Sequence, residues 1–125
     1  MTLLLDTHTF LWWISNPAEL TSAAAKALSD PRNRVLVSVV VLWEIAIKRV
    51  IGKLVAPVDL ERDVLRLGFE LLPITVTHIV ATEQLPLLHR DPFDRMLVAQ
   101  AVVERATLVT RDPSLPPYGV AVLTA

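Results

Sequence analysis

The residues of this sequence best suited to chemistry are four acids that stand beside or inside apolar segments: Asp6, Glu44, Asp94 and Asp112. Carboxylates that converge on one place repel one another unless a cation screens their charge. Their hard oxygen atoms suit Mg²⁺ or Mn²⁺, which bind proteins through a few carboxylates, waters and substrate phosphate. Ions held in this way polarise a phosphoryl oxygen and lower the pKa of water, so the four acids together indicate phosphodiester hydrolysis.

Three of the acids, taken singly, also have a purely structural interpretation. Asp6 is placed to cap a helix that follows it, and Asp112 before Pro113 suits an Asx turn. Asp94 stands at the third position of a helix that Asp91 would cap, where the helix dipole favours an acid. The structural and the catalytic interpretations are not exclusive, and both stay open at the level of the sequence.

Glu44 is the acid hardest to explain as a structural residue. It lies inside the apolar segment VVVLWEIAI, where burial of an unpaired carboxylate is costly or forces its protonation. A metal ion or another partner is therefore expected beside it. Lys48, four residues later, could supply that partner as an ion pair across one helical turn.

Alternating strands and helices are expected to position these acids. Strands are expected over residues 2–5, 35–37, 71–76, 107–110 and 120–123, and the first is apolar throughout, as in a strand buried on both faces of a parallel sheet. Helices are expected from Asp6 up to the Asn16-Pro17 break, from a cap at Thr21 or Ser22 through residue 28, and over 39–51, 59–67, 79–85 and 92–103. This alternation predicts a three-layer α/β domain with a mostly parallel sheet, and a ligand site beyond the carboxyl ends of the strands.

Composition fits one compact domain over residues 1–125. Of the 125 residues, 53% are hydrophobic, which is enough for a sizeable core. With 12 basic and 13 acidic residues the net charge is −1, so any nucleic-acid contact must come from a local patch. The sequence has no cysteine, which excludes disulfides, thiolate zinc sites and a cysteine nucleophile. No apolar run approaches the ~20 residues of a membrane span and no signal peptide is evident, so we expect a cytoplasmic protein without a membrane partner.

Four segments of the chain together resemble PIN-domain ribonucleases, most closely the VapC-like toxins of bacterial and archaeal toxin–antitoxin pairs. The segments are LLLDTHTFLW, VSVVVLWEIAIK, HRDPFDRMLVAQA and LVTRD, and they span nearly the whole chain in this order. One such segment would be a weak signal, whereas four in order with these spacings are specific. The resemblance implies a three-layer α/β/α PIN-like domain and a metal-dependent endoribonuclease, a hydrolase that leaves a 5′-phosphate and a 3′-hydroxyl.

The resemblance also implies roles for individual residues. The acids that would hold Mg²⁺ or Mn²⁺ and form the catalytic site are Asp6, Glu44, Asp94 and Asp112. Thr7, Ser38 and Thr110 would support them, the threonines through hydrogen bonds, while Asp91 would be a helix cap or a further supporting group. The expected partners are an RNA substrate, a cognate antitoxin protein and a second copy of the chain in a homodimer.

Basic residues close to the acids in the sequence are candidates for RNA contact: Lys48, Arg49, Arg90, Arg95 and Arg111. They would line the RNA path, or they would form ion pairs on a solvated face, as arginines near acids commonly do. His8 and His89 flank the acids and are candidates for substrate contact. Trp12, Trp13 and Trp43 are assigned to packing in the core or at an interface.

Two other functions are consistent with parts of this pattern. A phosphoryl-transfer enzyme would use Asp6 as a nucleophile and form an aspartyl phosphate, but such a site expects a second acid two residues later, where this sequence has His8. A non-catalytic protein-binding domain would use the same acids only to cap helices and to hold an ion. Measurement of turnover distinguishes this last alternative from the nuclease.

Overall fold

The computed structural model describes residues 1–57 and 59–125. The strands are β1 (Thr2–Leu5), β2 (Arg34–Ser38), β3 (Glu70–Leu72), β4 (Thr107–Thr110) and β5 (Val122–Thr124). The α-helices are α1 (Thr7–Ser15), α2 (Ser22–Ser29), α3 (Val39–Val50), α4 (Leu60–Arg66), α5 (Val76–Gln84) and α6 (Pro92–Glu104). Two short 3₁₀ helices are η1 (Pro17–Glu19) and η2 (Pro116–Tyr118). Within the described residues, no helix combines the length and the apolarity needed to cross a membrane.

The five strands form one sheet in the order β3-β2-β1-β4-β5, and every neighbouring pair is parallel. At the centre of the sheet, Leu5 of β1 lies opposite Val37 of β2 and Val109 of β4. The residues that come next on these three strands therefore lie side by side at the carboxyl edge of the sheet: Asp6, Ser38 and Thr110. The predicted parallel sheet is confirmed, and its register already brings a carboxylate next to two hydroxyls.

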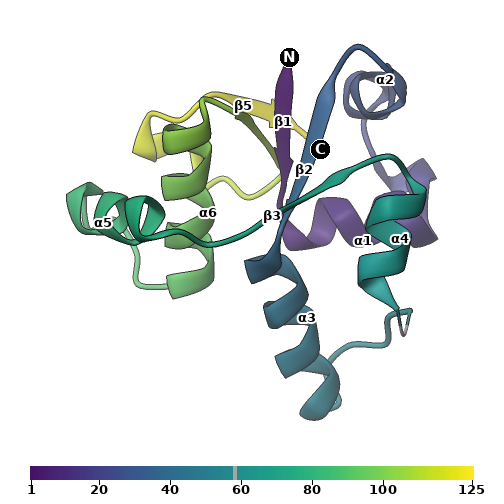
Figure 1. Ribbon diagram of the computed structural model, residues 1–125, viewed down its shortest axis with the longest axis horizontal. Helices are drawn as coiled ribbons and strands as arrows, with labels where there is room; N and C mark the ends of the chain where they lie inside the picture. Colours follow the sequence, from purple (N-terminus) through teal and green to yellow (C-terminus); the bar gives the residue numbers. More distant parts are fainter. Residues whose placement is uncertain (58) are drawn as a thin grey trace.

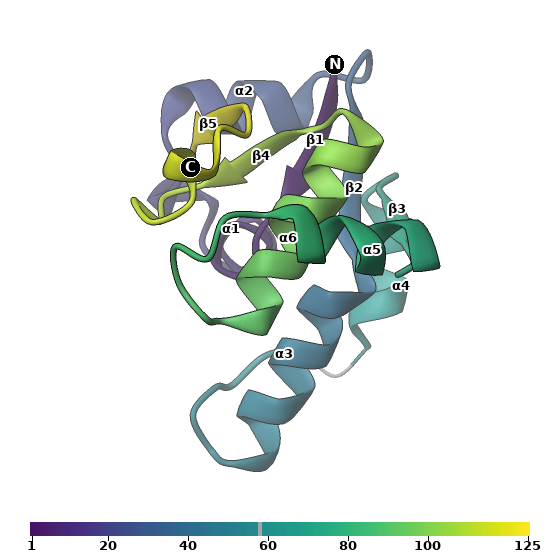
Figure 2. The same cartoon turned by 90° about the vertical axis from the view of Figure 1, so that its left-hand side faces the viewer.

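Helices cover both faces of the sheet, and α3 extends beyond its carboxyl edge. In Figure 1, α5 and α6 lie on one side of the strands, while α1, α2 and α4 lie on the other. Figure 2 shows α5 and α6 in front of the sheet and α3 continuing below the end of β2. The predicted three-layer α/β/α architecture is confirmed.

The middle strands of the sheet form the centre of the hydrophobic core. Leu3, Leu4 and Leu5 have no exposed surface, and the same holds for Leu36 and Val37 on the neighbouring strand. A central strand covered by helices on both faces buries both sets of its alternating side chains, which explains its unbroken apolar run. Each such side chain contributes about 1.5–3 kcal/mol through the apolar surface that it removes from water.

The segment after β3 becomes helical earlier than the sequence pattern predicts. A strand over residues 71–76 is expected, but β3 ends at Leu72 and Val76 begins α5, ahead of the predicted helix start at residue 79. The Thr75 hydroxyl accepts a hydrogen bond from the His78 amide, and His78 Nδ1 accepts one from the Thr75 amide. This reciprocal cap starts the helix and overrides the preference of valine for strands.

The last strand also begins later than predicted, at Val122 instead of residue 120. Gly119 ends η2 with a φ of 80°, a left-handed conformation that glycine adopts without strain. Residues 120 and 121 bring the chain from this turn back to the sheet, where the Leu108 amide donates to the Ala121 carbonyl. The turn therefore sets the start of β5, which the apolar pattern alone does not reveal.

Candidate active site

A cleft of about 390 Å³ opens at the carboxyl edge of the sheet, and all four acids expected to do chemistry line it. Its walls come from α1, α3, the start of α6 and the loop after β4. The lining residues are Asp6, Thr7, His8, Trp12, Glu44, Lys48, Asp91, Asp94, Arg111, Asp112 and Pro113. Open parallel α/β sheets commonly form their ligand sites at this edge. The fold thus gathers acids that are distant in the sequence around one solvent-filled space.

Asp6 is both a helix cap and a cleft residue. Its Oδ1 accepts a hydrogen bond from the Thr9 backbone amide at 2.9 Å, which caps α1 and typically contributes about 1 kcal/mol. Its Oδ2 accepts a hydrogen bond from the Thr110 hydroxyl at 2.5 Å. These two bonds, one on each oxygen, fix the orientation of the carboxylate at the end of β1.

Glu44 has a partner for each of its carboxylate oxygens. The Thr7 hydroxyl donates to Oε1 at 2.5 Å, and Lys48 Nζ lies 2.8 Å from Oε2. The Glu44 side chain is only 16% exposed, so both contacts are made largely out of water. A carboxylate in apolar surroundings is expected to have a partner. Glu44 has two, the Thr7 hydroxyl of α1 and Lys48, which lies one turn later on α3.

Asp94 titrates in a region of concentrated negative charge. Burial raises the pKa of Asp94 from 3.8 to about 6, and the charges of Asp91, Asp112 and Glu44 add to this rise. A hydrogen bond with His89, whose Nε2 lies 3.4 Å from Asp94 Oδ2, opposes it. The negative charges of these three acids therefore all disfavour ionisation of Asp94. A bound cation would reduce this repulsion between the carboxylates.

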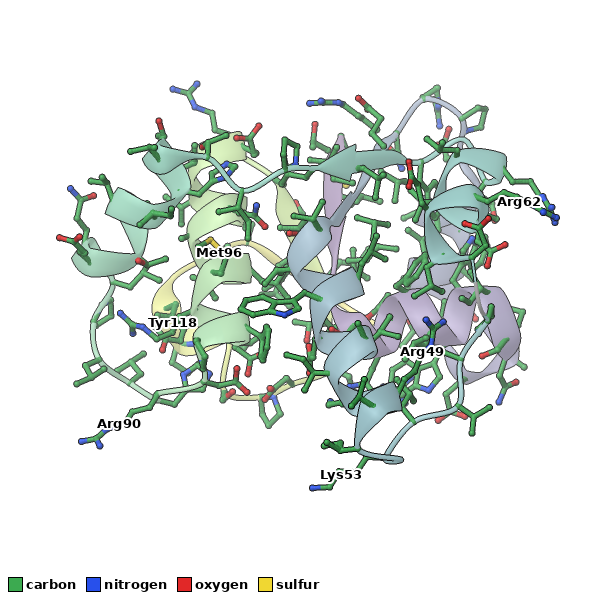
Figure 3. All side chains as sticks on the ribbon, turned by 60° about the horizontal axis from the view of Figure 1, so that its bottom comes forward. Arg49, Lys53, Arg62, Arg90, Met96 and Tyr118 are labelled. Carbon is green, nitrogen blue, oxygen red and sulfur yellow. The ribbon has the colours of Figure 1, made fainter. Side chains whose placement is uncertain are left out.

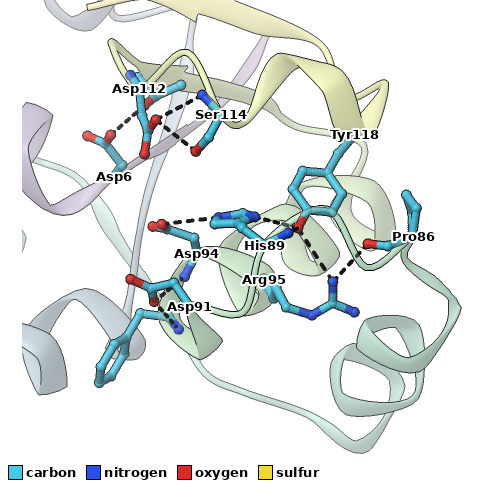
Figure 4. A network of polar contacts seen from close by, with 11 residues as sticks. Asp6, Pro86, His89, Asp91, Asp94, Arg95, Asp112, Ser114 and Tyr118 are labelled. Carbon is cyan, nitrogen blue, oxygen red and sulfur yellow. Dashed lines mark hydrogen bonds and ion pairs between the residues drawn. The ribbon is translucent and has the colours of Figure 1, made fainter.

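His89 is itself held by Tyr118, as Figure 4 shows. The Tyr118 hydroxyl lies 2.6 Å from His89 Nδ1, while the opposite ring nitrogen faces Asp94. Arg95 Nη1 reaches the same hydroxyl at 3.4 Å. This network connects η2 with the first turn of α6, and it orients the imidazole toward the acid.

Asp112 forms a turn and lines the cleft at the same time. Its Oδ1 accepts hydrogen bonds from the amide and the hydroxyl of Ser114, at 2.9 and 2.8 Å. The Asp112 amide donates to the Thr110 hydroxyl at 3.0 Å, the same hydroxyl that donates to Asp6. One threonine therefore ties the loop of Asp112 to the end of β1.

Two further residues expected to support the acids act as helix caps. Ser38 is fully buried, and its hydroxyl accepts a hydrogen bond at 3.1 Å from a backbone amide in the first turn of α3. Asp91 caps α6 by accepting from two backbone amides of its first turn, at 2.9 and 3.2 Å. Of the two, Asp91 lines the cleft, whereas Ser38 lies at the sheet edge outside the lining residues.

The basic residues expected along an RNA path fall into two groups. Lys48 and Arg111 line the cleft. Arg95 instead donates to two main-chain carbonyls of the segment before α6, at 2.9 and 2.8 Å. Arg90 projects into solvent, and Arg49 lies half-buried on α3 (Figure 3). The structure therefore places Arg49, Arg90 and Arg95 outside the residues that line the cleft.

The tryptophans differ in their surroundings. Trp12 packs partly against the core and also lines the cleft. Trp13, its neighbour on α1, faces a separate groove. Trp43 is 59% exposed and packs edge-on against Phe93, with ring centroids 5.2 Å apart. The assignment of all three to packing thus overlooks the position of Trp12 beside the acids.

Two residues of the site network escape analysis of the sequence. Ser114 carries a weak signal, since Asp-Pro-Ser after a strand suits an Asx turn with Ser114 as the donor. Tyr118 carries none, because it meets His89 only after the loop that follows β4 folds back toward α6.

The donor chemistry of the cleft suits a divalent cation. Throughout residues 1–57 and 59–125, however, no three Asp, Glu or His side chains form a compact group ready to ligate one ion. Instead, an ammonium group and threonine hydroxyls contact the oxygens of Glu44 and Asp6. Carboxylate oxygens and the raised pKa of Asp94 are what a site for Mg²⁺ or Mn²⁺ would present before it binds its ion. The donor types of the cleft therefore fit the ion, although the side chains do not form a ready-made set of ligands among the described residues.

Comparisons with known proteins identify the fold and the family of the chain. Ribonuclease VapC22 of Mycobacterium tuberculosis is 26% identical over 117 residues, which cover 91% of this chain and 89% of that protein. The crystal structure of VapBC2 from Rickettsia felis, bound to a DNA fragment from their promoter, shares the fold with a TM-score of 0.71 at 17% identity, over 98% of each chain. DNA-bound VapBC from Salmonella typhimurium does so with a TM-score of 0.67 at 19% identity, over 98% of this chain and 97% of that one. A family model of the PIN domain matches residues 3–119, and the chain therefore belongs to the PIN domain family.

Proposed function

We propose that this protein is a metal-dependent endoribonuclease and the toxin of a toxin–antitoxin pair. The observation that carries the proposal is the convergence of four acids on one cleft at the carboxyl edge of a PIN-domain sheet: Asp6, Glu44, Asp94 and Asp112. The similarity to ribonuclease VapC22 supports RNA as the substrate, and the fold shared with VapBC complexes supports an antitoxin as the partner.

The four acids would hold Mg²⁺ or Mn²⁺. In such sites the ion supplies polarisation of a phosphoryl oxygen and a lowered pKa of water. Thr7 and Thr110 hold Glu44 and Asp6 in fixed orientations through hydrogen bonds. The two carboxylates would therefore lose little rotamer freedom on binding an ion. Lys48 lines the cleft beside the acids, where its ammonium group can bind a phosphate oxygen of the substrate.

Cleavage of labelled total RNA by the purified, antitoxin-free protein tests the proposal. The reactions contain Mg²⁺ or Mn²⁺, and parallel reactions contain EDTA. Asp94→Asn removes one charge from the cleft with little change in shape. Asp63→Asn makes the same change on α4, away from the cleft, and is the matched control. We expect discrete fragments from the wild type and from Asp63→Asn, and none with EDTA or with Asp94→Asn.

Other outcomes point to other functions. Cleavage that persists in EDTA would contradict metal dependence. Folded protein that cleaves no RNA with either ion would favour a non-catalytic binding domain. Transfer of a labelled phosphoryl group to the protein, abolished by Asp6→Asn, would identify the phosphoryl-transfer alternative.

We infer that a small antitoxin protein binds this chain and blocks the cleft. The fold shared with two VapBC complexes supports this partner. Co-expression with a short reading frame next to the gene tests it. The antitoxin should copurify with the wild type and should suppress cleavage of RNA at equimolar concentration. Copurification without inhibition would place the partner away from the cleft.

A homodimer is the remaining part of the proposal. Apolar side chains are exposed on α3 and α5, with Val50 at 86%, Ile79 at 48% and Val80 at 48%. These side chains lie on two separate helices, and large exposed apolar side chains can mark an interface between proteins. Analytical ultracentrifugation of the free protein should show the mass of two chains, and a single-chain mass at all concentrations would contradict the dimer.

A further inference from the structure

Three planar side chains stand together on one wall of the cleft: His8 and Trp12 of α1, and Arg111 of the loop after β4. The Arg111 guanidinium lies over the Trp12 ring, 4.4 Å from its centroid. The rings of His8 and Trp12 have centroids 5.8 Å apart and are tilted by 39°. We call these three residues the stacking wall. His8 is its exposed ring, whereas Trp12 is half-buried.

Two members of the stacking wall, Trp12 and Arg111, are fixed from behind. Arg111 donates to the main-chain carbonyl of Glu19, to the carboxylate of Glu19 at 3.2 Å and to the carbonyl of Ala125 at 3.0 Å. Trp12 packs against the hydrophobic core. Because these donors of Arg111 are engaged, its guanidinium shapes the wall and is less available to bind a phosphate. A planar surface that is already ordered loses little conformational entropy when a ligand stacks on it.

The position of the wall indicates its ligand. His8 lies two residues after Asp6, and Arg111 directly precedes Asp112, so that the wall and the acids line the same cleft. An RNA whose phosphodiester bond faces the acids brings the attached nucleoside to the adjoining surface. Imidazole, indole and guanidinium planes all stack favourably on nucleobases. A base inside a duplex has both faces covered by its neighbours, so only an unpaired base can use such a surface.

We propose that the stacking wall binds the face of one unpaired nucleobase next to the phosphodiester bond to be cleaved. This inference rests on the proposed ribonuclease function and adds a substrate subsite to it. His8 contacts the base, Trp12 lies beside His8, and Arg111 lies over Trp12. Because every nucleobase has a π-face, the wall favours unpaired over paired RNA without choosing among the bases.

A double-mutant cycle between protein and RNA tests the proposal. Binding of a labelled single-stranded oligoribonucleotide is measured by fluorescence anisotropy with Mg²⁺ in an Asp94→Asn background, which prevents cleavage. His8→Ala removes the exposed ring, and His8→Phe restores an aromatic face without ring nitrogens. Trp13→Leu, on the same helix but facing a separate groove, is the matched control. A series of oligonucleotides that each carry one abasic position removes single bases from the RNA.

Stacking of one base contributes ~1–3 kcal/mol, so we expect His8→Ala to weaken binding by roughly 5- to 150-fold. His8→Phe and Trp13→Leu should bind like the background protein. One abasic position should cause the same loss as His8→Ala in the background protein and no further loss when combined with His8→Ala. Binding of a duplex of the same sequence should not change with His8→Ala.

Several results would overturn the stacking wall. One is an RNA affinity that His8→Ala does not change, and another is a His8→Phe variant that fails to restore binding. A third is an abasic position that still weakens binding in the His8→Ala variant. The fourth is a background protein that does not bind RNA at all. Cleavage of the same oligonucleotide by the wild type, run in parallel, separates the two proposals. Cleavage without the stacking signature rejects the wall alone, whereas folded wild-type protein that does not cleave rejects the nuclease.

Discussion

The Thr7 hydroxyl donates a 2.5 Å hydrogen bond to Glu44 Oε1 and so joins the first turn of α1 to the middle of α3. Thr7 is only 4% exposed, so water does not readily replace this contact. Lys48 contacts the other oxygen of Glu44 through a longer, flexible side chain. The neutral hydroxyl therefore keeps the carboxylate oriented even when the ammonium group moves.

Thr7→Val replaces this hydroxyl with a methyl group of similar size. We expect the affinity for Mn²⁺ and the rate of RNA cleavage to fall by roughly 10- to 100-fold, as is typical when the partner of a metal-binding side chain is lost. Titration calorimetry and cleavage assays measure both quantities. Thr9→Val is the matched control, since it removes a hydroxyl on the same helix that donates to the Val109 carbonyl at 2.9 Å. Equal losses in the two variants would reduce Thr7 to a residue needed only for folding.

Asp94 gives the free energy of unfolding a pH dependence of known sign. The pKa of its carboxyl is about 6 in the folded protein, compared with the ordinary value of 3.8 that applies to the unfolded chain. At low pH the group is protonated in both states and has no effect. As pH rises through these two values, the folded state resists ionisation and stability is lost, by on the order of 3 kcal/mol at most.

Asp94→Asn should abolish this loss. In EDTA, the stability of the variant relative to the wild type should rise between about pH 4 and pH 6 and then stay constant. Urea denaturation at a series of pH values measures the difference, in which the contributions of the other carboxylates largely cancel. A difference that does not change with pH would show that the cleft does not shift the titration of Asp94.

Lys48→Met tests the electrostatic part of RNA binding. If its ammonium group binds a phosphate, the slope of log K against log salt should become less negative by about one unit, and binding should weaken most at low salt. Lys53→Met is the control, because Lys53 lies beyond the end of α3 and projects away from the protein in Figure 3. Equal slopes for wild type and Lys48→Met would assign this lysine to Glu44 alone.

Arg95 is expected to stabilise the fold and not to bind RNA. Its guanidinium donates to the carbonyls of Thr82 and Pro86, and charged hydrogen bonds of this kind contribute about 1.5–3 kcal/mol each. Arg95→Met removes both bonds and should therefore lower the free energy of unfolding by at least about 1.5 kcal/mol, while the salt dependence of RNA binding stays unchanged. Arg90→Met, a change of an exposed neighbour, should affect neither. If Arg95→Met changes the salt dependence of RNA binding and leaves the free energy of unfolding unchanged, Arg95 contacts RNA instead.

The frame of the molecule and the grouping of the acids could be predicted because both depend on short-range patterns. An unbroken apolar run predicts a strand buried on both faces, and the residue after it must lie at the carboxyl edge of the sheet. This reasoning places Asp6 correctly, and Asp112 lies at the same edge two residues after the end of β4. The sequence leaves open whether these acids are structural or cleft residues, and the structure explains why: Asp6 caps a helix, Asp112 forms a turn, and both line the cleft.

The contacts that could not be predicted depend on how loops fold back in three dimensions. Nothing near Arg95 in the sequence indicates that its donors point to the chain before α6 and not to the cleft. The pairing of His89 with Tyr118 likewise depends on the path of the loop after β4. Trp12 and Trp13 are adjacent and chemically identical, and only the direction of α1 decides which of them faces the acids.

The place of β4 in the sheet also has a consequence for protein synthesis. This strand lies between β1 and β5, yet its residues 107–110 are made after β1, β2 and β3. Before β4 has been made, the edge of β1 that pairs with it is unpaired, and the hydrogen bond from Thr110 to Asp6 cannot form. Asp112, which follows β4 in the sequence, is then also missing. The four acids can therefore line one cleft only after residues 107–112 have been made and β4 has paired with β1.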